Sequence, residues 1–424
     1  MKSAILPKII IAILFCSILC APHILTGQST QNITGIIITN STWTRANSPY
    51  SLTGPVAVDE GVTLNIEPGV KINLNGFYIQ VNGTLRAIGG SAKDISFDNG
   101  EIFFYQTSPG WVEGNGLGSI IGNAKLTSIH ININHTSPKI DSNSIMGEIH
   151  CHESSTIITN NDITGYRAIF LSRSNALIAN NTIHSENTGI ECLSDKSLID
   201  SNKIYGGKTG IISGSATVLR NTVVGCDVGI DAQVFSTVEK NLILNNNRYG
   251  IINRGTITSN NTIANNTVGI YAAEASLIIY NNLENNVEYN LHLNPDTAAN
   301  IDASENWWGT TDFTIIDQKI YDYNDDFNLG KVTYTPVLTA ANPQAIPDSA
   351  PIPATPPTLS PSNSPSSTPN SATQNPTATP VEPNSGFSVF LGLDWVGIAV
   401  VVLLAVIVVL LVVVVVFLRR RSVG

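Results

Sequence analysis

The sequence predicts an all-β fold, a right-handed parallel β-helix solenoid of about 12–14 coils, followed by a single C-terminal transmembrane helix. Three features predict it: an asparagine that returns about every 20 residues, a Gly-Ile pair half a period out of phase, and a long apolar run, Val396–Leu418. The recurring asparagines are Asn161, Asn181, Asn202, Asn221, Asn241, Asn261 and Asn282.

The composition of the repeat favours strands over helices. It is rich in Asn, Gly, Thr and β-branched residues, which disfavour helix and suit short strands joined by tight turns. A leucine-rich repeat would need a recurring leucine frame, which the sequence lacks. We expect each asparagine to lie at a turn, because Asn tolerates the left-handed conformation, and to bond the equivalent amide one coil along.

Aliphatic residues that keep a fixed distance from the asparagines are predicted to fill the core. Two positions after the asparagine they are Ile163, Ile183, Ile204, Val223, Ile243 and Ile263. Three positions before it they are Ile158, Ile178, Ile199, Val218, Val238 and Ile279, with Thr258 as the exception.

These coils resemble the right-handed β-helix repeats of the pectin-lyase-like superfamily, including NosD-like proteins. Ser48–Gly89 resembles the opening coils of archaeal and bacterial surface β-helix proteins, and Asn306–Leu338 resembles their closing coil. The resemblance covers roughly Trp43–Leu338. It implies the fold but no single function, because this solenoid occurs in lyases, hydrolases, epimerases and plain binding proteins.

The remaining segments are interpreted as export and anchoring elements. The predicted organisation is a signal peptide (1–27), a lead-in (28–42), the β-helix (43–338), a Pro/Ser/Thr-rich stalk (339–386), a transmembrane anchor (387–418) and a cytoplasmic tail (419–424).

The N-terminus has the layout of a secretory signal. Lys2 and Lys8 precede an apolar run, Ile9–Ala21, and small and polar residues follow. The run is short for a membrane span, but no clean cleavage site follows it, so an uncleaved signal anchor is the alternative. Both interpretations direct the chain out of the cytoplasm.

The C-terminal apolar run is predicted to cross the membrane. As a helix, Val396–Leu418 would be about 35 Å long, enough for a bilayer. Arg419, Arg420 and Arg421 follow at once, which places the tail in the cytoplasm and the β-helix outside the cell. A buried soluble helix is disfavoured because the run contains no charge. The preceding Asn342–Ser385 holds twelve prolines and suits an extended stalk.

The charge balance and the sequons bear on partners. The formal net charge of -10 argues against nucleic acid as a partner. Seven Asn-X-Thr sequons are candidate glycosylation sites, although an Asn-rich β-helix produces this tripeptide by composition alone. They begin at Asn32, Asn40, Asn82, Asn134, Asn180, Asn260 and Asn265.

Three cysteines lie within the predicted solenoid, Cys151, Cys192 and Cys226. Cys192 should point into the core, one step after an outward Glu191. Cys151 precedes it by about two coils, or roughly 9.6 Å along the axis, which is beyond disulfide reach. We expect no disulfide between them.

Two groups of residues have the chemistry of metal ligands. His150 and His152 would share one face of a strand beside Glu153, and could hold a transition metal if another ligand joined them. The alternative is an outward polar strand edge, which we favour because no second cluster completes the site.

Alternating oxygen ligands near the C-terminus suggest calcium. Asp322, Asn324 and Asp326 have the spacing of a calcium loop, but Phe327 and Thr333 replace the glycine and glutamate of an EF-hand. A plain acidic closing turn is the preferred interpretation, and no cofactor is predicted.

One outward row of side chains is the candidate functional surface. Coil register predicts that it comprises Phe170, Glu191, Ile212, Asp231, Ile252, Tyr271 and His292. Glu191 and Asp231, two coils apart at roughly 9.6 Å, have a separation suited to the acid and base of an inverting glycosidase. Two solvated acids are the simpler interpretation, because Ile212 and Ile252 make a poor polar subsite.

Two classes of function remain open. The first is a non-catalytic display, structural or carbohydrate-binding module, in which Phe170, Tyr271 and His292 contact sugar rings or hydroxyls. The second is a polysaccharide-cleaving or epimerising enzyme that uses Glu191 and Asp231. We favour the first, because the catalytic motifs of the superfamily are missing and the row holds few basic residues.

The topology generates the first testable prediction. Protease treatment of intact cells should release the solenoid by cutting within 342–385, because an extended proline-rich chain outside the membrane is accessible. Deletion of 396–424 should convert the protein to a secreted form. Protection of 342–385 in intact cells would contradict this orientation.

Overall fold

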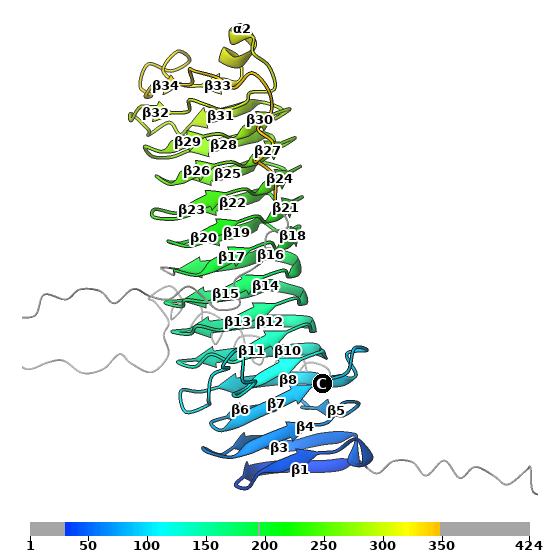
Figure 1. Cartoon of the computed structure of the whole chain (residues 1–424). Helices are drawn as coiled ribbons and strands as arrows, with labels where there is room; N and C mark the ends of the chain where they lie inside the picture. The colour runs from blue at the N-terminus through cyan, green and yellow to red at the C-terminus, as the bar shows by residue number, and fades with distance from the viewer. Residues whose placement is uncertain (1–29, 194–195, 348–424) are drawn as a thin grey trace, which may run out of the picture. The chain divides into compact units, whose positions relative to one another are not determined.

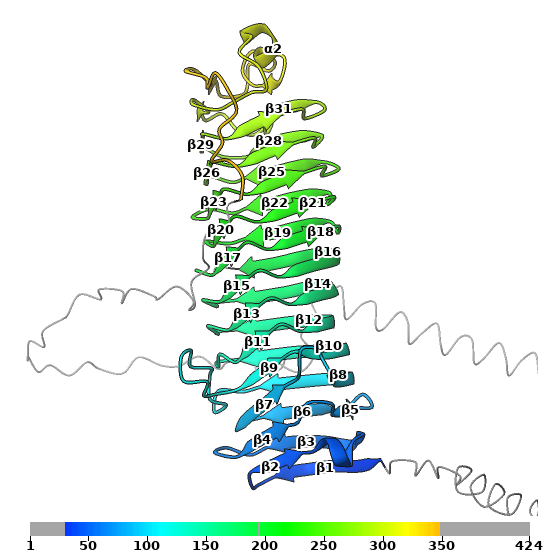
Figure 2. The same cartoon turned by 45° about the vertical axis from the view of Figure 1, so that its right-hand side comes forward.

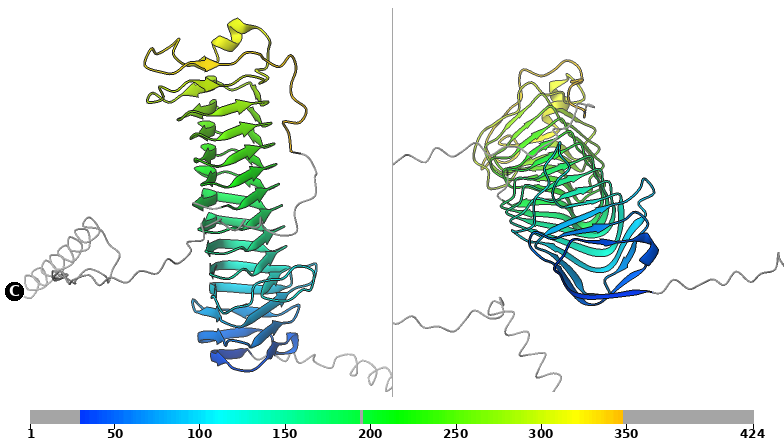
Figure 3. Two further views of the ribbon diagram at one scale, coloured as in Figure 1. Left: turned by 60° about the vertical axis from the view of Figure 1, so that its left-hand side comes forward. Right: turned by 60° about the horizontal axis from the view of Figure 1, so that its bottom comes forward.

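The computed structural model describes residues 30–193 and 196–347, all within one compact unit, Met1–Pro361. These residues form a parallel β-helix whose coils stack from β1 to β34 (Figure 1). The stacking is equally clear when the solenoid is turned (Figure 2) and from its side and end (Figure 3). A 14-stranded sheet receives one strand from each coil, which agrees with the predicted 12–14 coils. The all-β solenoid is confirmed.

The 14-stranded sheet forms one face of the stack. Its strands are β2 Ser41–Trp43, β4 Thr63–Ile66, β7 Thr84–Ile88, β9 Ile120–Gly122, β11 Lys139–Asp141, β13 Ile157–Thr159, β15 Leu177–Ala179, β17 Leu198–Asp200, β20 Thr217–Leu219, β23 Thr237–Glu239, β26 Ile257–Ser259, β29 Leu277–Ile279, β32 Ile301–Asp302 and β34 Val332–Thr333.

A 20-stranded sheet supplies the rest of each coil. Its strands are β1 Gln31–Ile37, β3 Tyr50–Val58, β5 Lys71–Asn73, β6 Tyr78–Val81, β8 Ile95–Phe104, β10 Ala124–Asn134, β12 Ser144–His152, β14 Asp162–Ser172, β16 Thr182–Leu193, β18 Lys203–Tyr205, β19 Thr209–Ser213, β21 Thr222–Val224, β22 Val228–Ala232, β24 Leu242–Leu244, β25 Tyr249–Asn253, β27 Thr262–Ala264, β28 Val268–Ala272, β30 Asn282–Glu284, β31 Tyr289–Leu293 and β33 Ile320–Tyr321. Among the described residues, two short helices, η1 Arg45–Asn47 and α2 Phe313–Asp317, complete the elements.

The coils change character along the chain. From β8 to β16 one long strand bends around a corner, whereas later coils divide it into two short strands. The break falls at residues in the left-handed region: Gly225, Asn245, Asn265 and Asn285 have φ between 55° and 73°. Only Gly, Asn and Asp adopt this region readily, so these residues place the corner.

The predicted core residues face inward. Ile163, Ile183, Ile204, Val223, Ile243 and Ile263 have no exposed surface, and neither do Ile158, Ile178, Ile199, Val218, Val238 and Thr258. Stacked aliphatic columns therefore form one continuous core, as the repeat predicts.

The asparagine ladder is confirmed, and it is longer than predicted. In each step the backbone N–H and side-chain Nδ2 of one asparagine donate to Oδ1 of the next; for Asn241 to Asn261 these bonds are 2.8 and 2.9 Å. Asn241 Nδ2 also donates to the Val218 carbonyl at 2.9 Å. The ladder runs through Asn143, Asn161, Asn181, Asn202, Asn221, Asn241, Asn261, Asn281 and Asn306.

The predicted last rung, Asn282, is wrong by one residue. Asn281 joins the ladder, whereas Asn282 begins β30, pairs with Thr262 and donates to its hydroxyl at 3.1 Å. The aliphatic partner moves with it, so Ile278 is buried and Ile279 is not. The ladder asparagines were also expected to adopt the left-handed conformation themselves. In the structure the residue before the ladder asparagine adopts it instead, for example Asn260 with φ 55°.

A second asparagine ladder was missed. Asn246, Asn266 and Asn286 are buried at the other corner, and the N–H and Nδ2 groups of Asn246 donate to Asn266 Oδ1 at 2.9 Å. Their 20-residue spacing was visible in the sequence. Cys226 precedes them in register, and its N–H donates to Asn246 Oδ1 at 3.0 Å.

The three cysteines are buried, as predicted. Cys151 and Cys192 both pair with Leu171 of β14, from opposite sides, so they lie two coils apart in register. Burial raises the pKa of the Cys226 thiol to about 12, and its Sγ donates to the Gly206 carbonyl at 3.0 Å. These thiols are core and turn residues.

Both predicted boundaries of the β-helix differ from the structure. β1 begins at Gln31, inside the segment expected as a lead-in, and pairs in parallel with β3. At the other end, the first residues of the predicted stalk run back along the coils as a strap, Leu338–Pro347. Asn342 exchanges two hydrogen bonds with Asn282, of 2.7 and 3.1 Å.

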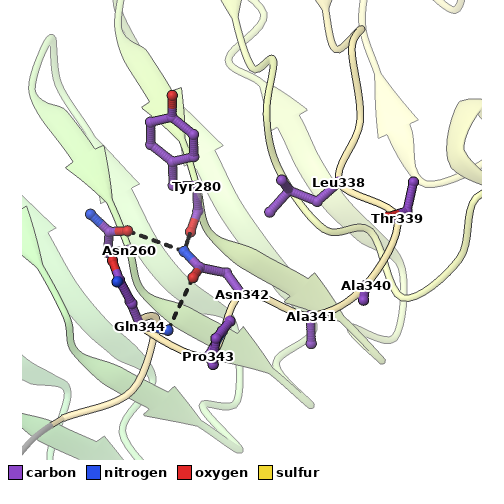
Figure 4. Close-up of a pocket in the computed structure, with 9 residues that line it drawn as sticks. All are labelled: Asn260, Tyr280, Leu338, Thr339, Ala340, Ala341, Asn342, Pro343 and Gln344. Carbon is purple, nitrogen blue, oxygen red and sulfur yellow. Dashed lines mark hydrogen bonds between the residues drawn. The ribbon is translucent and has the colours of Figure 1, made fainter.

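The strap lies against the neighbouring coils that carry Asn260 and Tyr280 (Figure 4). Asn342 Nδ2 donates to Asn260 Oδ1 at 3.1 Å and to the Tyr280 carbonyl at 2.7 Å. Beyond it, the Thr262 hydroxyl donates to the Ala345 carbonyl at 2.6 Å. A pocket of ≈ 470 Å³ opens between the strap and Tyr280. The strap thus ties the last coils together from outside.

The predicted membrane segments lie elsewhere in the chain. Within residues 30–193 and 196–347, no helix is long and apolar enough to cross a membrane. The signal peptide (1–27), the anchor (387–418), the tail (419–424) and the stalk beyond residue 347 are outside the described residues.

The ladder generates a stability prediction. Asn241→Ala should lower the unfolding free energy by about 3 kcal/mol, because the N–H and Nδ2 of Asn221 lose their buried acceptor. Asn247→Ala is the matched control, since Asn247 is exposed and bonds only Asp227 through its side chain. Chemical denaturation measures both. Equal, small losses would show that the ladder does not stabilise the fold.

Candidate functional site

Strand pairing places the predicted outward row in a single column. Successive partners across β14, β16, β19, β22, β25, β28 and β31 are Phe170, Glu191, Ile212, Asp231, Ile252, Tyr271 and His292. Every member is partly exposed. The column continues to Tyr321 of β33 at one end and to His150 of β12 at the other. The predicted row is therefore confirmed and longer than expected.

The two acids of the column are held by arginines. Glu191 Oε2 lies 3.2 Å from Arg167 Nη1. Asp231 accepts from Arg254 through both carboxylate oxygens, at 2.9 and 3.3 Å, and from Gln233 Nε2 at 2.9 Å. Hydrogen bonding to Asp231 raises the pKa of the Arg254 guanidinium.

These ion pairs change the sequence-based interpretation. An inverting acid–base pair needs two carboxyl groups that are free to act on the substrate, whereas each of these acids is held by a guanidinium. Ile212 also lies between the two acids. The row itself holds no lysine or arginine, as expected, but Arg167 and Arg254 reach its acids from neighbouring positions, which the sequence analysis did not anticipate.

An aromatic cluster occupies the C-terminal end of the column. His292 stacks on Tyr321 with a centroid distance of 4.4 Å and on Tyr271 at 5.5 Å. The ring centroids of Tyr249 and Tyr271 are 4.7 Å apart, and those of Tyr289 and His292 are 5.2 Å apart. We call Tyr249, Tyr271, Tyr289, His292 and Tyr321 the aromatic cluster.

Sequence reasoning found only part of this cluster. Tyr271 and His292 were predicted from the row, but Tyr249 and Tyr289 belong to the next column, in which both pair with Val268. Tyr321 was missed because the closing coil does not follow the repeat. Their positions in the repeat could have identified Tyr249 and Tyr289. Tyr249 directly precedes a Gly-Ile pair, and Tyr289 directly precedes Asn290-Leu291, which occupies the same place in its coil.

The cluster is partly removed from water. Burial raises the pKa of Tyr271 and of Tyr289, so both phenols are protonated near neutral pH. The Tyr271 hydroxyl donates to Asn294 Oδ1 at 2.9 Å, and the Arg248 guanidinium lies 4.8 Å from the Tyr249 ring. The surface therefore combines aromatic rings with phenol and guanidinium groups.

His292 is the most unusual member. Its Nδ1 is buried and has no hydrogen-bond partner among the residues that the structure describes. Burial lowers the pKa of the imidazole, and the nearby Leu293 backbone offsets part of that effect. The neutral ring is therefore the favoured form.

Phe170 lies apart from the cluster. Five coil steps separate it from Tyr271, or about 24 Å along the axis. The centroid of its ring lies 4.2 Å from Arg167 Cζ and 5.7 Å from the ring centroid of His150. Phe170 and Tyr271 therefore do not contact one sugar ring together.

The predicted histidine pair does not form one site. His150 Nε2 lies 2.8 Å from Glu148 Oε2. His152 instead belongs to a group of potential metal ligands with His135 and Glu153. His135 was missed, because it lies one coil earlier at a turn.

The acidic residues of the closing turn have structural partners. Asp322 accepts from the N–H groups of Asn324 and Val332, at 2.9 Å each, and Asp326 accepts from the Asn328 N–H at 3.0 Å. Asp322 and Asn324 line a pocket of ≈ 500 Å³, but Asp326 does not. These bonds account for the alternating pattern as turn chemistry, and calcium stays the alternative that the sequence disfavoured.

The sequon asparagines are all at least partly exposed. Asn32, Asn40, Asn180 and Asn265 are exposed, and Asn82, Asn134 and Asn260 are partly buried. The Asn260 sequon differs from the equivalent Asn180 sequon because the strap bonds both Asn260 and Thr262.

A family model supports the β-helix fold. The model of the right handed beta helix region matches residues 127–268. The periplasmic alginate epimerase AlgG is 13% identical with a TM-score of 0.39, and the match covers 67% of this chain and 74% of that chain. The A-module of the Azotobacter vinelandii mannuronan C-5 epimerase AlgE6 is 10% identical with a TM-score of 0.25, over 74% and 91%.

No curated protein sequence matched this chain. At such low identities and TM-scores, the two structural likenesses say nothing about what this chain binds or transforms.

The environment of His292 generates a prediction for pH dependence. NMR should show His292 titrating below the ordinary pKa of 6.5. As the pH falls, His292 of the unfolded chain is protonated at a higher pH than His292 of the folded protein. The free energy of unfolding should therefore decrease below about pH 6.5. His292→Gln identifies the signal and should remove this part of the slope. Titration at or above 6.5 would contradict the buried, neutral ring.

Proposed function

We propose that this protein is a membrane-anchored extracellular β-helix module that binds a neutral polysaccharide without transforming it. The observation that carries the proposal is the aromatic cluster, in which five rings in mutual contact share one partly exposed surface; four are stacked or tilted and Tyr289 meets His292 edge-on. Aromatic faces with polar edges are suited to the apolar faces and equatorial hydroxyls of sugar rings.

The regular column suits a polymer. Coil spacing repeats at about 4.8 Å, so ring faces and polar groups recur along a straight, rigid surface. Tyr271, His292 and Tyr321 come from three successive strands of that surface. A polysaccharide running along the axis would meet them in order, and little ordering of the protein would be needed.

The charges near the column favour a neutral ligand. Arg167 and Arg254 already neutralise Glu191 and Asp231. A uronic acid polymer would have to compete with these carboxylates for the guanidinium groups. Sugar hydroxyls can bond the same paired groups without breaking the ion pairs.

The anchor belongs to the same proposal. Its support is the apolar run Val396–Leu418, followed by Arg419–Arg421, and the signal-like Met1–Gly27. The chain between Pro347 and the run would hold the binding surface away from the membrane. This arrangement suits attachment of a cell-envelope or environmental glycan.

One observation supports a second candidate, a polysaccharide-active enzyme. His292 has a lowered pKa and lies against the protonated phenol of Tyr271. A neutral imidazole beside a phenol has the chemistry of a base and an acid for proton transfer. The enzyme would then use this end of the column and not Glu191 and Asp231.

A polysaccharide panel tests the two candidates together. The purified full-length protein is offered neutral and uronate-containing polymers, and binding is measured alongside new reducing ends, unsaturated products and epimerised residues. We expect binding of a neutral polymer and no product. Tyr271→Ala should weaken binding roughly tenfold, because a stacked ring at the centre of a binding surface contributes about 1–2 kcal/mol.

The control is Tyr205→Ala, because Tyr205 stacks on His184 at 5.2 Å outside the aromatic cluster. It should leave binding unchanged. Equal losses in both variants would contradict the proposed surface. Product formation that is lost in His292→Gln would establish the enzyme in place of the binding module.

A further inference from the structure

Three charged or basic side chains stack at one turn, outside the outward column. His135, Glu153 and Arg173 are left-handed, with φ of 56°, 48° and 50°, in three successive coils. The His135 N–H donates to the His152 carbonyl and the Glu153 N–H to the Ser172 carbonyl, each at 3.0 Å. These backbone bonds fix the side chains one above another at the end of β10, β12 and β14.

Two imidazoles and one carboxylate meet at this turn. His135 Nε2 lies 2.8 Å from Glu153 Oε2, and His152 Nε2 lies 3.5 Å from Glu153 Oε1. The potential ligand atoms of all three residues lie within 4.8 Å of one another. A tetrahedral ion with bonds of about 2.1 Å holds its ligand atoms about 3.4 Å apart, so small side-chain rotations would complete the geometry.

Arg173 already places a cation at this point. Its Nη1 lies 3.2 Å from Glu153 Oε1, and its Nη2 lies 3.1 Å from His152 Nε2. A guanidinium can only donate hydrogen bonds, so His152 Nε2 must present its lone pair. That lone pair is the one an imidazole offers to a metal ion.

We propose that His135, His152 and Glu153 bind a divalent first-row transition ion, such as Zn²⁺, and that Arg173 leaves when the ion enters. The side chain of Arg173 is 64% exposed, so it can turn into solvent at small cost. Two imidazoles favour such an ion over Ca²⁺ or Mg²⁺, which prefer oxygen ligands. Water completes the coordination, because the turn lies at the surface.

The site does not depend on the glycan-binding proposal. It shares no residue with the aromatic cluster and lies at a turn several coils away, next to the strand that carries His150. An ion that bridges His135 of one coil and His152–Glu153 of the next would also join two coils through side chains. Metal binding should therefore stabilise this part of the solenoid.

Titration of the metal-free full-length protein with Co²⁺ and Zn²⁺ tests the site. We expect one equivalent of Co²⁺ to give a visible ligand-field spectrum, which Zn²⁺ removes by displacement. His135→Ala and His152→Ala should each weaken binding about tenfold or more. Arg173→Gln should tighten it, because the competing cation is gone.

His150→Ala is the matched control, because His150 also contacts a carboxylate on the same strand, Glu148, but belongs to no three-ligand group among the described residues. It should bind metal as the unchanged protein does. Circular dichroism checks that each variant is folded. Absence of a one-equivalent spectrum in the unchanged protein, or binding that survives both His135→Ala and His152→Ala, would overturn the proposal, as would weaker binding in Arg173→Gln.

Discussion

The solenoid depends on one recurring interaction, the bond from each ladder asparagine to the next. In each step two donors of one coil share a single Oδ1 of the following coil, and the side-chain amide also reaches a carbonyl of the coil before. The amides are buried, so a misplaced coil would leave several polar groups unsatisfied at once. The ladder therefore fixes register as well as stability. Register in turn decides which side chains of distant sequence positions lie in one column.

The sequence predicted those features that the period itself encodes. Inward aliphatic residues and the outward column follow directly from counting, because side chains alternate along a strand. Counting failed where two neighbours could both fit, as at Asn281 and Asn282, and where a coil departs from the repeat, as at Tyr321. It also failed for Arg167 and Arg254, because a long side chain reaches across columns and its choice of partner is not periodic. His135 was missed for the same reason as Tyr321: its coil lies outside the most regular part of the repeat.

The charge pairing supports the proposal that Glu191 and Asp231 do not act as a catalytic pair. An acid–base mechanism needs acids that are free to contact the substrate, whereas Glu191 and Asp231 each face a guanidinium. The aromatic cluster differs, because burial there keeps His292 neutral and Tyr271 protonated. The two ends of the same column thus have different chemistry on one uniform backbone. Side chains, and not the fold, decide what each section of the solenoid can do.

The strap adds a mechanical consequence to the proposed anchoring. A β-helix pulled from its last coil would lose its end coils one at a time, because each coil contacts only its neighbours. Here the chain first runs back from the closing coil to Thr262, bonding Asn282 and Asn260 on the way. Any load that enters beyond Pro347 therefore reaches the side of the stack, where several hydrogen bonds share it. The start of the strap is also bonded to the closing coil, because the Leu338 N–H donates to the carbonyl of Asn306, the last rung of the ladder. The strap thus protects the ladder at the end where a tethered solenoid would otherwise begin to open.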